Sequence, residues 1–349
     1  MPSLPVPVAA AILRAALALP EPVQRGLVRR PVVIDGQTLA TETQLLLTLQ
    51  RLVGEPGFAL RALGPSRNDI IRQARVAGGR QPIGAVRELT VDGAEGSIRA
   101  RLYVPSARRD AEPAPTLMFF HGGGMALGDL DTHDAACRHL AEHSGVQVIS
   151  VDYRRAPEHP FPAGVDDCFS AYQWLVKNAD AVNADPDRLA VGGDSAGGYF
   201  AATTAIQAAE AGLPLAFQLL VYPCTDFVNE SVSFRLFGGG DFHLTAEGIG
   251  RASGWYFPDP ADRHHPLGSV LLRDDLPAGL ASAHVVTAGF DPLRDEGEAY
   301  ADLLAAHGVT VTRKRYPSMI HGFFNIVGVG REARAHNREI AGRLAEALA

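Results

Sequence analysis

The chain has 349 residues, of which 46% are hydrophobic and 36 are glycines, and its formal net charge is -7 at pH 7. This length and composition predict a large α/β core with an added cap, and they exclude a disordered or very small protein. The negative net charge argues against nucleic acid or an anionic membrane as the main partner. Three cysteines without C-x-x-C spacing predict reduced structural thiols.

The first 85 residues carry helical signals and no strand pattern. The stretch from Leu4 to Leu19 is apolar and interrupted by Arg14, and Thr41 to Val53 places leucines at helical spacing. A membrane span would be too short here, and no basic region precedes the apolar run as in a secretory signal. The sequence therefore predicts an N-terminal helical cap segment over residues 1–85, no stable membrane insertion and a cytoplasmic location.

From residue 86 onward, apolar strand patterns alternate with helical ones. This rhythm predicts an α/β core over 86–349, an eight-stranded, mostly parallel sheet with helices on both faces. The rhythm breaks at about 226–266, where glycines, prolines and aromatic residues predict a looped, partly helical cap insertion. The predicted strands lie near 86–91, 97–104, 115–120, 146–151, 188–193, 217–222, 283–289 and 309–316, and the helices near 133–144, 164–179, 196–211, 293–307 and 332–348.

One pentapeptide suggests nucleophilic chemistry. Residues 193–197 read Gly-Asp-Ser-Ala-Gly, between a strand pattern and a helix rich in small residues. This is the G-x-S-x-G nucleophile elbow, in which a sharp strand-to-helix turn exposes a serine hydroxyl to its base. Ser195 is therefore the predicted nucleophile. Asp194 is too close to Ser195 in the chain to orient a base, so a structural hydrogen bond is predicted for it.

An acid and a histidine follow the elbow in the order that such a triad requires. Asp291 ends the predicted strand 283–289, and His321 follows the strand 309–316 after a short turn. Asp295 and Glu296 compete with Asp291, but they fall inside the helix that begins near residue 293. The sequence therefore predicts Ser195, Asp291 and His321 as catalytic residues.

A glycine loop precedes the elbow. His121 and Gly122, Gly123 and Gly124 follow the strand 115–120 directly. Residues without side chains let backbone N–H groups approach a developing negative oxygen, as the HGGG loop of lipases and esterases does. Further along, Arg155 and Glu158 are expected to form an ion pair that anchors their loop. No metal or cofactor motif accompanies these elements, so neither is predicted.

Several longer stretches resemble one family, the hormone-sensitive-lipase-like (bacterial family IV) esterases of the α/β-hydrolase superfamily. The resemblance covers roughly residues 85–349 and is weaker before them. It implies a serine carboxylesterase acting on a small-molecule ester, with Ala196 and two of Gly122, Gly123 and Gly124 as oxyanion donors. The stretches are 121–124 (HGGG), 129–134 (DLDTHD), 152–163 (DYRRAPEHPFPA), 192–198 (GGDSAGG), 291–297 (DPLRDEG) and 321–324 (HGFF).

The chain departs from the family pattern near the expected pocket. Met125 stands where an aromatic residue usually follows the glycines, and Tyr199 replaces the usual asparagine after the elbow. Both are predicted to bind substrate, with a preference for short- to medium-chain acyl groups. Amidase, lactonase or acyltransferase activity stays open, as does a homodimer. A ligand receptor on the same fold is disfavoured because His321 is present, whereas the related plant gibberellin receptors lack the catalytic histidine.

Overall fold

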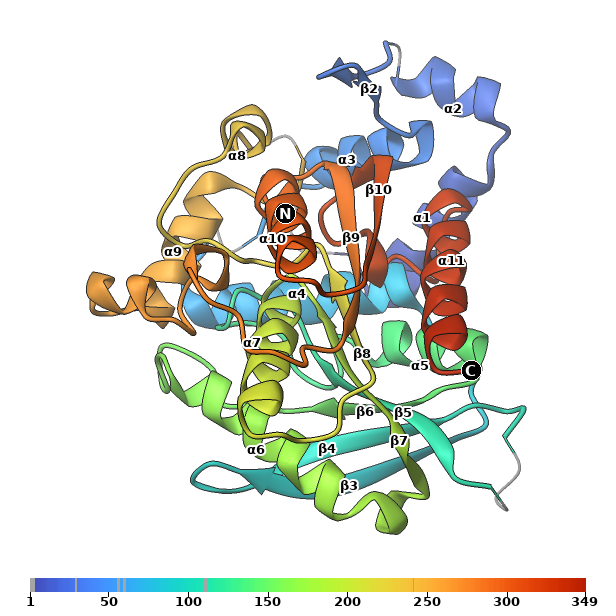
Figure 1. The fold of residues 1–349 in the computed structure, drawn as a ribbon. Helices are drawn as coiled ribbons and strands as arrows, with labels where there is room; N and C mark the ends of the chain where they lie inside the picture. Colours follow the sequence, from blue (N-terminus) through green and yellow to red (C-terminus); the bar gives the residue numbers. More distant parts are fainter. Residues whose placement is uncertain (1–3, 29, 55–56, 59–60, 109–111, 241) are drawn as a thin grey trace.

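The structure is a computed structural model that describes residues 4–28, 30–54, 57–58, 61–108, 112–240 and 242–349 (Figure 1). Within these residues the central sheet has eight strands, in which β4 runs antiparallel to both of its neighbours, β3 and β6, and all other neighbouring pairs are parallel. The predicted sheet is thereby confirmed. The strands in sheet order are β10 (Val311–Ile320), β9 (Ser282–Phe290), β8 (Phe217–Val221), β7 (Ala184–Asp194), β5 (Ala114–Phe120), β6 (Gln147–Val151), β4 (Gly96–Val104) and β3 (Ala85–Gly93).

Helices cover both faces of this sheet because its central strands are apolar on both sides. In β5, Leu117 and Phe119 pack with α5 and α11, whereas Met118 and Phe120 belong to the core that α6, α7 and α10 complete. The burial of every residue in β5 follows from this double cover. The helices are α5 (Asp134–Ser144), α6 (Ala163–Lys177), α7 (Ala196–Glu210), α10 (Arg294–Ala306) and α11 (Glu332–Ala347), with short 3-10 turns η1 (Ala179–Val182), η3 (Val270–Leu272) and η4 (Phe323–Asn325).

The N-terminal segment is helical, but the prediction that it contains no strand was wrong. A two-stranded hairpin, β1 (Val33–Ile34) and β2 (Gln37–Thr38), lies between its helices. Asp35 and Gly36 form the turn with φ of 53° and 70°, the left-handed values that a tight two-residue hairpin needs. The helices of this segment are α1 (Val6–Ala18), α2 (Glu21–Val28), α3 (Thr41–Leu52) and α4 (Leu63–Gly78).

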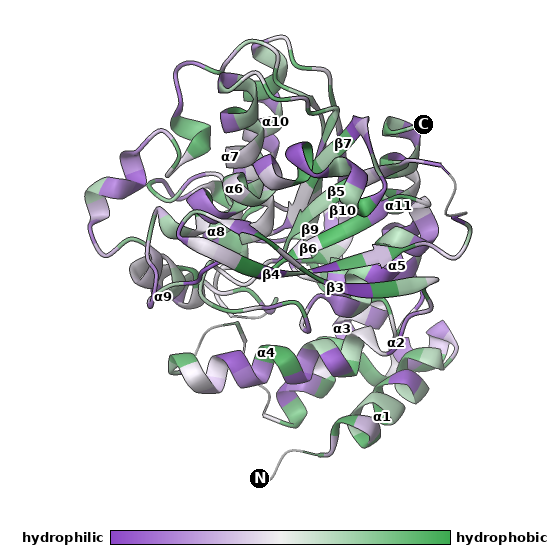
Figure 2. Cartoon of the chain, turned by 90° about the horizontal axis from the view of Figure 1, so that it is seen from below, coloured by the Kyte–Doolittle hydropathy of each residue, from purple (hydrophilic) through white to green (hydrophobic). Residues whose placement is uncertain are grey.

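The insertion after β8 contains α8 (Val232–Phe237), α9 (Ala246–Tyr256) and the short turn η2 (Pro260–His264). It touches the N-terminal segment directly. The backbone N–H of Phe58 donates to the His243 carbonyl at 3.0 Å, and Arg251 donates to the Arg61 carbonyl at 3.2 Å. Figure 2 shows α1 to α4 grouped together on one side of the sheet.

Membrane-spanning length is not reached by any single helix of the described chain. Only α1 and α2 taken together, with a bend of 109° between them, have the length and composition of a span.

Candidate active site

The turn between β7 and α7 places Ser195 at the carboxyl end of the sheet. Ser195 has φ 58°, and its backbone N–H donates to the Val221 carbonyl at 2.8 Å. A Cβ on Gly193 or on Gly197 would overlap the carbonyl oxygen of Phe120 in β5. Two glycines are therefore required for the elbow to pass this close to its neighbouring strand.

A continuous hydrogen-bonded chain joins Ser195 to His321 and Asp291. The Ser195 Oγ lies 2.9 Å from His321 Nε2, and His321 Nδ1 lies 2.8 Å from Asp291 Oδ2. Asp291 and His321 are both buried. Asp291 Oδ1 also accepts the backbone N–H of Leu293 at 2.8 Å, which holds the carboxylate in place. The structure thus brings the three predicted catalytic residues together.

The competing carboxylates point elsewhere. Asp295 Oδ2 accepts the N–H of Ser233 at 2.7 Å, and Glu296 Oε1 accepts the N–H of Thr225 at 2.7 Å. Burial raises the pKa of Glu296 well above its usual value. Both side chains tie the insertion to α10, and Asp291 is the carboxylate that contacts the histidine.

The glycine loop after β5 lies against the elbow. Gly123 and Gly124 have φ of 129° and 58°, and a Cβ on Gly123 would overlap the Leu127 carbonyl, so glycine is required there. The N–H of Gly122 donates to Asp194 Oδ1 at 2.9 Å. That amide is therefore engaged within the protein, and Gly123 and Gly124 are the two loop residues whose amides remain as candidate oxyanion donors. Ala196 begins α7, so its N–H belongs to the unpaired first turn of that helix.

Asp194 joins the glycine loop to two residues that sequence reasoning did not single out. Its Oδ1 lies 3.1 Å from His133 Nε2, and its Oδ2 accepts the side-chain amide of Asn325 at 3.1 Å. Burial alone would raise the pKa of Asp194, but His133 and the Gly122 amide together hold it below its usual value. The predicted structural role of Asp194 is consistent with these contacts. The only signal for His133 was its place in the family-like stretch 129–134.

A cavity of about 690 Å³ opens onto Ser195 and His321. Its walls come largely from apolar residues of α1, α3 and α4, together with Phe58 and Ile320. His243 of the insertion also lines it, and burial, reinforced by nearby His321, lowers the pKa of His243 to about 4. Met125 and Tyr199 do not line this cavity. Met125 is buried, and the fully buried Tyr199 hydroxyl donates to the Leu267 carbonyl at 2.5 Å, so their substrate-binding roles stay predictions.

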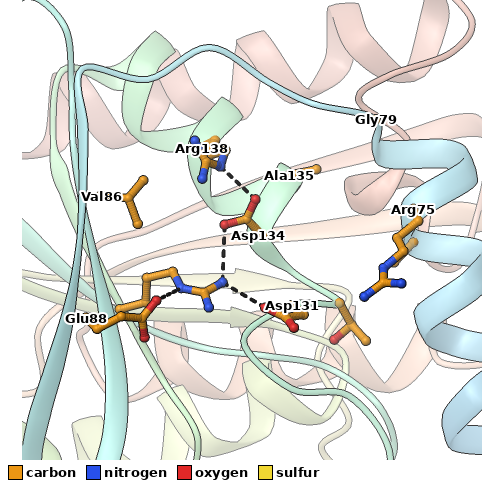
Figure 3. A pocket seen from close by; sticks show the side chains of 11 residues that line it. Arg75, Gly79, Val86, Glu88, Asp131, Asp134, Ala135 and Arg138 are labelled. Atoms are coloured by element: carbon orange, nitrogen blue, oxygen red, sulfur yellow. Dashed lines mark hydrogen bonds and ion pairs between the residues drawn. The ribbon is translucent and has the colours of Figure 1, made fainter.

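A second cavity, of about 430 Å³, lies between α4, β3, β4 and α5 (Figure 3). Its charges are paired across the space. Arg101 contacts Glu88 at 2.6 Å, Asp131 at 3.1 Å and Asp134 at 3.3 Å, and Arg138 contacts Asp134 at 2.6 Å. Figure 3 shows Glu88, Asp131 and Asp134 at this cavity, with Arg138 beside Asp134. This network fixes the 129–134 loop that carries His133, and no cluster of metal-ligating side chains occurs among the described residues.

The predicted ion pair between Arg155 and Glu158 is not formed. Glu158 pairs instead with Arg67 of α4, whose guanidinium lies 2.7 Å from its Oε1 and also donates to the Ala126 carbonyl at 2.9 Å. Arg155 donates to the Gly128 carbonyl. Arg67 had no sequence signal because it lies 91 residues before Glu158. It joins the N-terminal segment to the loop that follows the three glycines.

Comparison with known proteins gives consistent relatives. The sequence profile of the alpha/beta hydrolase fold family matches residues 117–325. The carboxylic ester hydrolase LipN of Mycobacterium tuberculosis is 42% identical over 338 residues, which cover 93% of this chain and 88% of LipN. The carboxylesterase NlhH of the same organism is 42% identical over 249 residues, 70% of this chain and 77% of NlhH.

Solved structures agree. The Pyrobaculum calidifontis esterase is 38% identical with a TM-score of 0.80, covering 87% of this chain and 99% of that chain. A thermostable esterase from Pseudomonas putida is 34% identical with a TM-score of 0.83, covering 89% of this chain and 98% of that chain. The chain therefore belongs to the α/β-hydrolase fold family and, within it, to the hormone-sensitive-lipase-like (bacterial family IV) esterases.

Proposed function

We propose that this protein is a serine carboxylesterase in which Ser195 is the nucleophile, His321 the general base and Asp291 the residue that orients it. The observation that carries the proposal is the unbroken chain from Ser195 Oγ through the His321 imidazole to the buried Asp291 carboxylate. The names and folds of the relatives support the same class, carboxylic ester hydrolases.

The reaction follows from this chain of contacts. His321 Nε2 takes the Ser195 hydroxyl proton as Oγ attacks the ester carbonyl carbon, and the carbonyl double bond opens to an oxyanion. The Asp291 carboxylate stabilises the imidazolium that forms. As the carbon–oxygen bond to the alcohol breaks, His321 returns the proton to the leaving alkoxide. Water then repeats the sequence on the acyl-enzyme, releasing the acid and restoring the serine.

The N–H groups of Gly123, Gly124 and Ala196 stabilise the oxyanion in this proposal. Gly122 acts differently from its neighbours because its amide is held by Asp194. Gly122 thus fixes the position of the loop, and the amides of the next two residues are the ones assigned to the oxyanion. One oxyanion donor is typically worth about 3 kcal/mol of barrier.

Residues 1–85 and the insertion at 226–266 together form the cap. Support comes from the contacts of Phe58 with His243 and of Arg61 with Arg251, and from the α1, α3 and α4 residues that wall the cavity. This enclosure favours short- to medium-chain acyl groups, because each added CH₂ gains about 0.8 kcal/mol only while it finds apolar wall. The cytoplasmic location and the homodimer remain predictions from the sequence.

A panel of p-nitrophenyl esters from about two to sixteen acyl carbons tests the cavity assignment. We expect kcat/KM to peak at about four to eight carbons. Rates that keep rising to the longest esters would contradict the enclosed acyl site.

Ser195→Ala tests the mechanism. Because triad members act as a unit, we expect kcat on p-nitrophenyl butyrate to fall at least about 10³-fold while the circular dichroism spectrum is unchanged. A fluorophosphonate probe should label Ser195 in the wild type and leave Ser195→Ala unlabelled. Retained turnover above about a tenth of wild type would reject the nucleophile. A matched p-nitroanilide panel separates esterase from amidase activity.

A further inference from the structure

Exposed apolar side chains are concentrated at the N-terminus. Among the described residues, twelve large hydrophobic side chains are exposed, and eight of these lie within the first 53 positions. Such a concentration marks a surface that has an apolar partner. The eight are Leu4, Val8, Ile12, Val23, Leu27, Val33, Leu52 and Val53.

Helix α1 is apolar on both faces. Its inner face buries Ala10, Leu13 and Leu17 against the rest of the segment. Val8 and Ile12 on its outer face are 45% and 50% exposed, and Leu4, two residues before the helix, is 43% exposed. Arg14 is the only charged residue of α1. A helix that is hydrophobic all round is normally buried, so this outer face needs a partner outside the described fold.

The charge of the chain is divided between its two parts. The first 85 residues contain ten arginines and five acidic residues, a net charge of +5, whereas the other 264 contain 22 basic and 34 acidic residues, a net charge of -12. The whole-chain value of -7 hides this division. The exposed arginines of the described N-terminal segment are Arg14, Arg25, Arg30, Arg51, Arg61, Arg75 and Arg80.

The apolar surface continues into the cavity. Leu4, Ile12, Leu52 and Val53 are exposed, and all four also line the cavity that contains Ser195. Whatever covers this surface therefore also faces the mouth of the cavity. Figure 2 shows α1 at the outer edge of the molecule, with α3 and α4 between it and the sheet.

We propose that α1, α2 and the end of α3, the N-terminal surface, bind reversibly to an anionic phospholipid bilayer. The exposed apolar side chains would lie at the level of the headgroups and upper acyl chains, with the nearby exposed arginines, Arg14, Arg25, Arg30 and Arg51, against lipid phosphates. The acidic remainder is repelled by the same surface, which orients the cavity mouth toward the lipid. Two helices of 13 and 8 residues with a 109° bend between them suit a position in the interface plane.

A second copy of the chain fits this surface less well. Symmetric pairing would set one positively charged segment against another and would cover the residues that line the cavity mouth. A bilayer has the opposite charge, and it can hold esters dissolved among its acyl chains. Only this last point, delivery of an ester to Ser195, rests on the proposed function; the binding itself does not.

Co-sedimentation of the full-length protein with lipid vesicles tests the proposal. We expect binding to phosphatidylcholine vesicles containing about 30% phosphatidylglycerol to exceed binding to pure phosphatidylcholine at least about threefold at about 0.05 M NaCl. The excess should disappear near 0.5 M NaCl, where the Debye length falls to roughly 4 Å. Failure to bind either vesicle, or equal binding to both, would overturn the proposal.

The double variant Val8→Asp/Val23→Asp assigns binding to the surface. Both residues lie in the first turn of their helices, where an added carboxylate suits the helix dipole and preserves the fold. We expect its partition coefficient on anionic vesicles to fall at least about tenfold, since two charges enter the interface. The matched control is Val232→Asp, a 56% exposed position in the first turn of α8, which should bind like the wild type.

Two further readouts separate the alternatives. Hydrolysis of p-nitrophenyl butyrate in vesicle-free buffer should be the same in wild type and all variants, so loss of vesicle binding is distinguishable from failure of the esterase assignment. Light scattering without lipid measures self-association. The lipid proposal would be overturned in favour of a second copy if the wild type formed a dimer and did not bind vesicles, and if the double variant were monomeric.

Discussion

At the scale of single residues, strained backbone gathers around the proposed catalytic centre. Six non-glycine residues of the described chain have positive φ, and four of them lie at or beside the site. Such conformations cost free energy and persist where the surrounding structure imposes them, often at functional sites. Ser195 forms the elbow, and Met125 follows the glycine loop. Tyr222 packs on His321 with ring centroids 4.5 Å apart, and His243 lines the cavity.

Asp194 is the residue whose role is most open to a direct test. Asp194→Asn keeps the shape of the side chain but replaces one acceptor oxygen by a donor amide among Gly122, His133 and Asn325. We expect kcat to fall about 10- to 100-fold as the oxyanion loop shifts, with KM changed less than about threefold. Steady-state kinetics on one soluble ester provide the measurement.

The matched control for this variant is Asp302→Asn. Asp302 is an exposed carboxylate on α10 that pairs with Arg313 on β10, away from the cavity. Its kinetics should equal those of the wild type. A kcat for Asp194→Asn within about twofold of the control would show that Asp194 does not position the loop.

At the scale of elements, the elbow depends on how closely α7 approaches β5. A Cβ on Gly197 would overlap the Phe120 carbonyl, so Gly197→Ala must push the helix away from the strand. Overpacking of this kind costs about 1 to 3 kcal/mol. Gly342→Ala in α11 is the control, since no atom lies within 4 Å of its added Cβ, and a gain of up to about 1 kcal/mol is expected there. The free energy of unfolding, measured with urea, should therefore decrease in Gly197→Ala and increase in Gly342→Ala. A change in the same direction in both variants would contradict the close approach of α7 to β5.

Most elements could be predicted from periodicity, and the exceptions have local causes. The hairpin β1–β2 was missed because each strand has only two residues, too few to show alternation. The predicted strand 309–316 ends before Pro317, but β10 continues to Ile320 with a register shift between Tyr316 and Ile320. Pro317 lacks an N–H for the ladder, so the sequence resembles a turn where the strand is only interrupted.

The candidate site was predictable where motifs mark it and hidden where contacts are long-range. The order of the elbow, Asp291 and His321 in the chain was sufficient to place three residues in contact. His133 and Asn325 meet at 3.4 Å across 192 residues. His133 was marked only by its place in the family-like stretch 129–134, and Asn325 carries no motif signal. That Asp194 would engage the Gly122 amide, and so distinguish it from Gly123 and Gly124, needed the three-dimensional arrangement.

At the scale of the whole molecule, the parallel sheet assembles the site. Ser195, Asp291 and His321 follow β7, β9 and β10, and the glycine loop follows β5. The carboxyl ends of parallel strands meet at one edge of a sheet, so residues far apart in sequence converge there. The N-terminal helices and His243 of the insertion line the cavity at that edge, so one side of the site has a largely apolar wall.

The buried histidines predict how the stability of the whole protein depends on pH. Burial lowers the pKa of His121 to about 3, and the pKa values of His139, His243 and His284 to about 4. Well above pH 6.5, the ordinary pKa of histidine, these groups are neutral in both folded and unfolded chains. As the pH falls below 6.5 the unfolded chain takes up protons first, so the free energy of unfolding decreases until the folded pKa is reached. Burial also raises the pKa values of Asp166, Glu296 and Glu332, and these three carboxyl groups oppose the trend but are fewer than the histidines.

We therefore expect the free energy of unfolding, measured with urea, to fall between pH 7.5 and pH 5, by up to about 1.4 kcal/mol per pH unit for each histidine. His284→Asn removes one of the histidines that lower stability in acid. The Thr312 hydroxyl lies 2.8 Å from His284 Nδ1, and the asparagine amide keeps a donor toward it. This pair lies far from Ser195 along β9 and β10. The variant should lose less stability on acidification than the wild type, by about 1 to 2 kcal/mol at pH 5. If the free energy of unfolding depended on pH equally in the two proteins, His284 would have an ordinary pKa in the folded state. Its imidazolium would then be accommodated between β9 and β10.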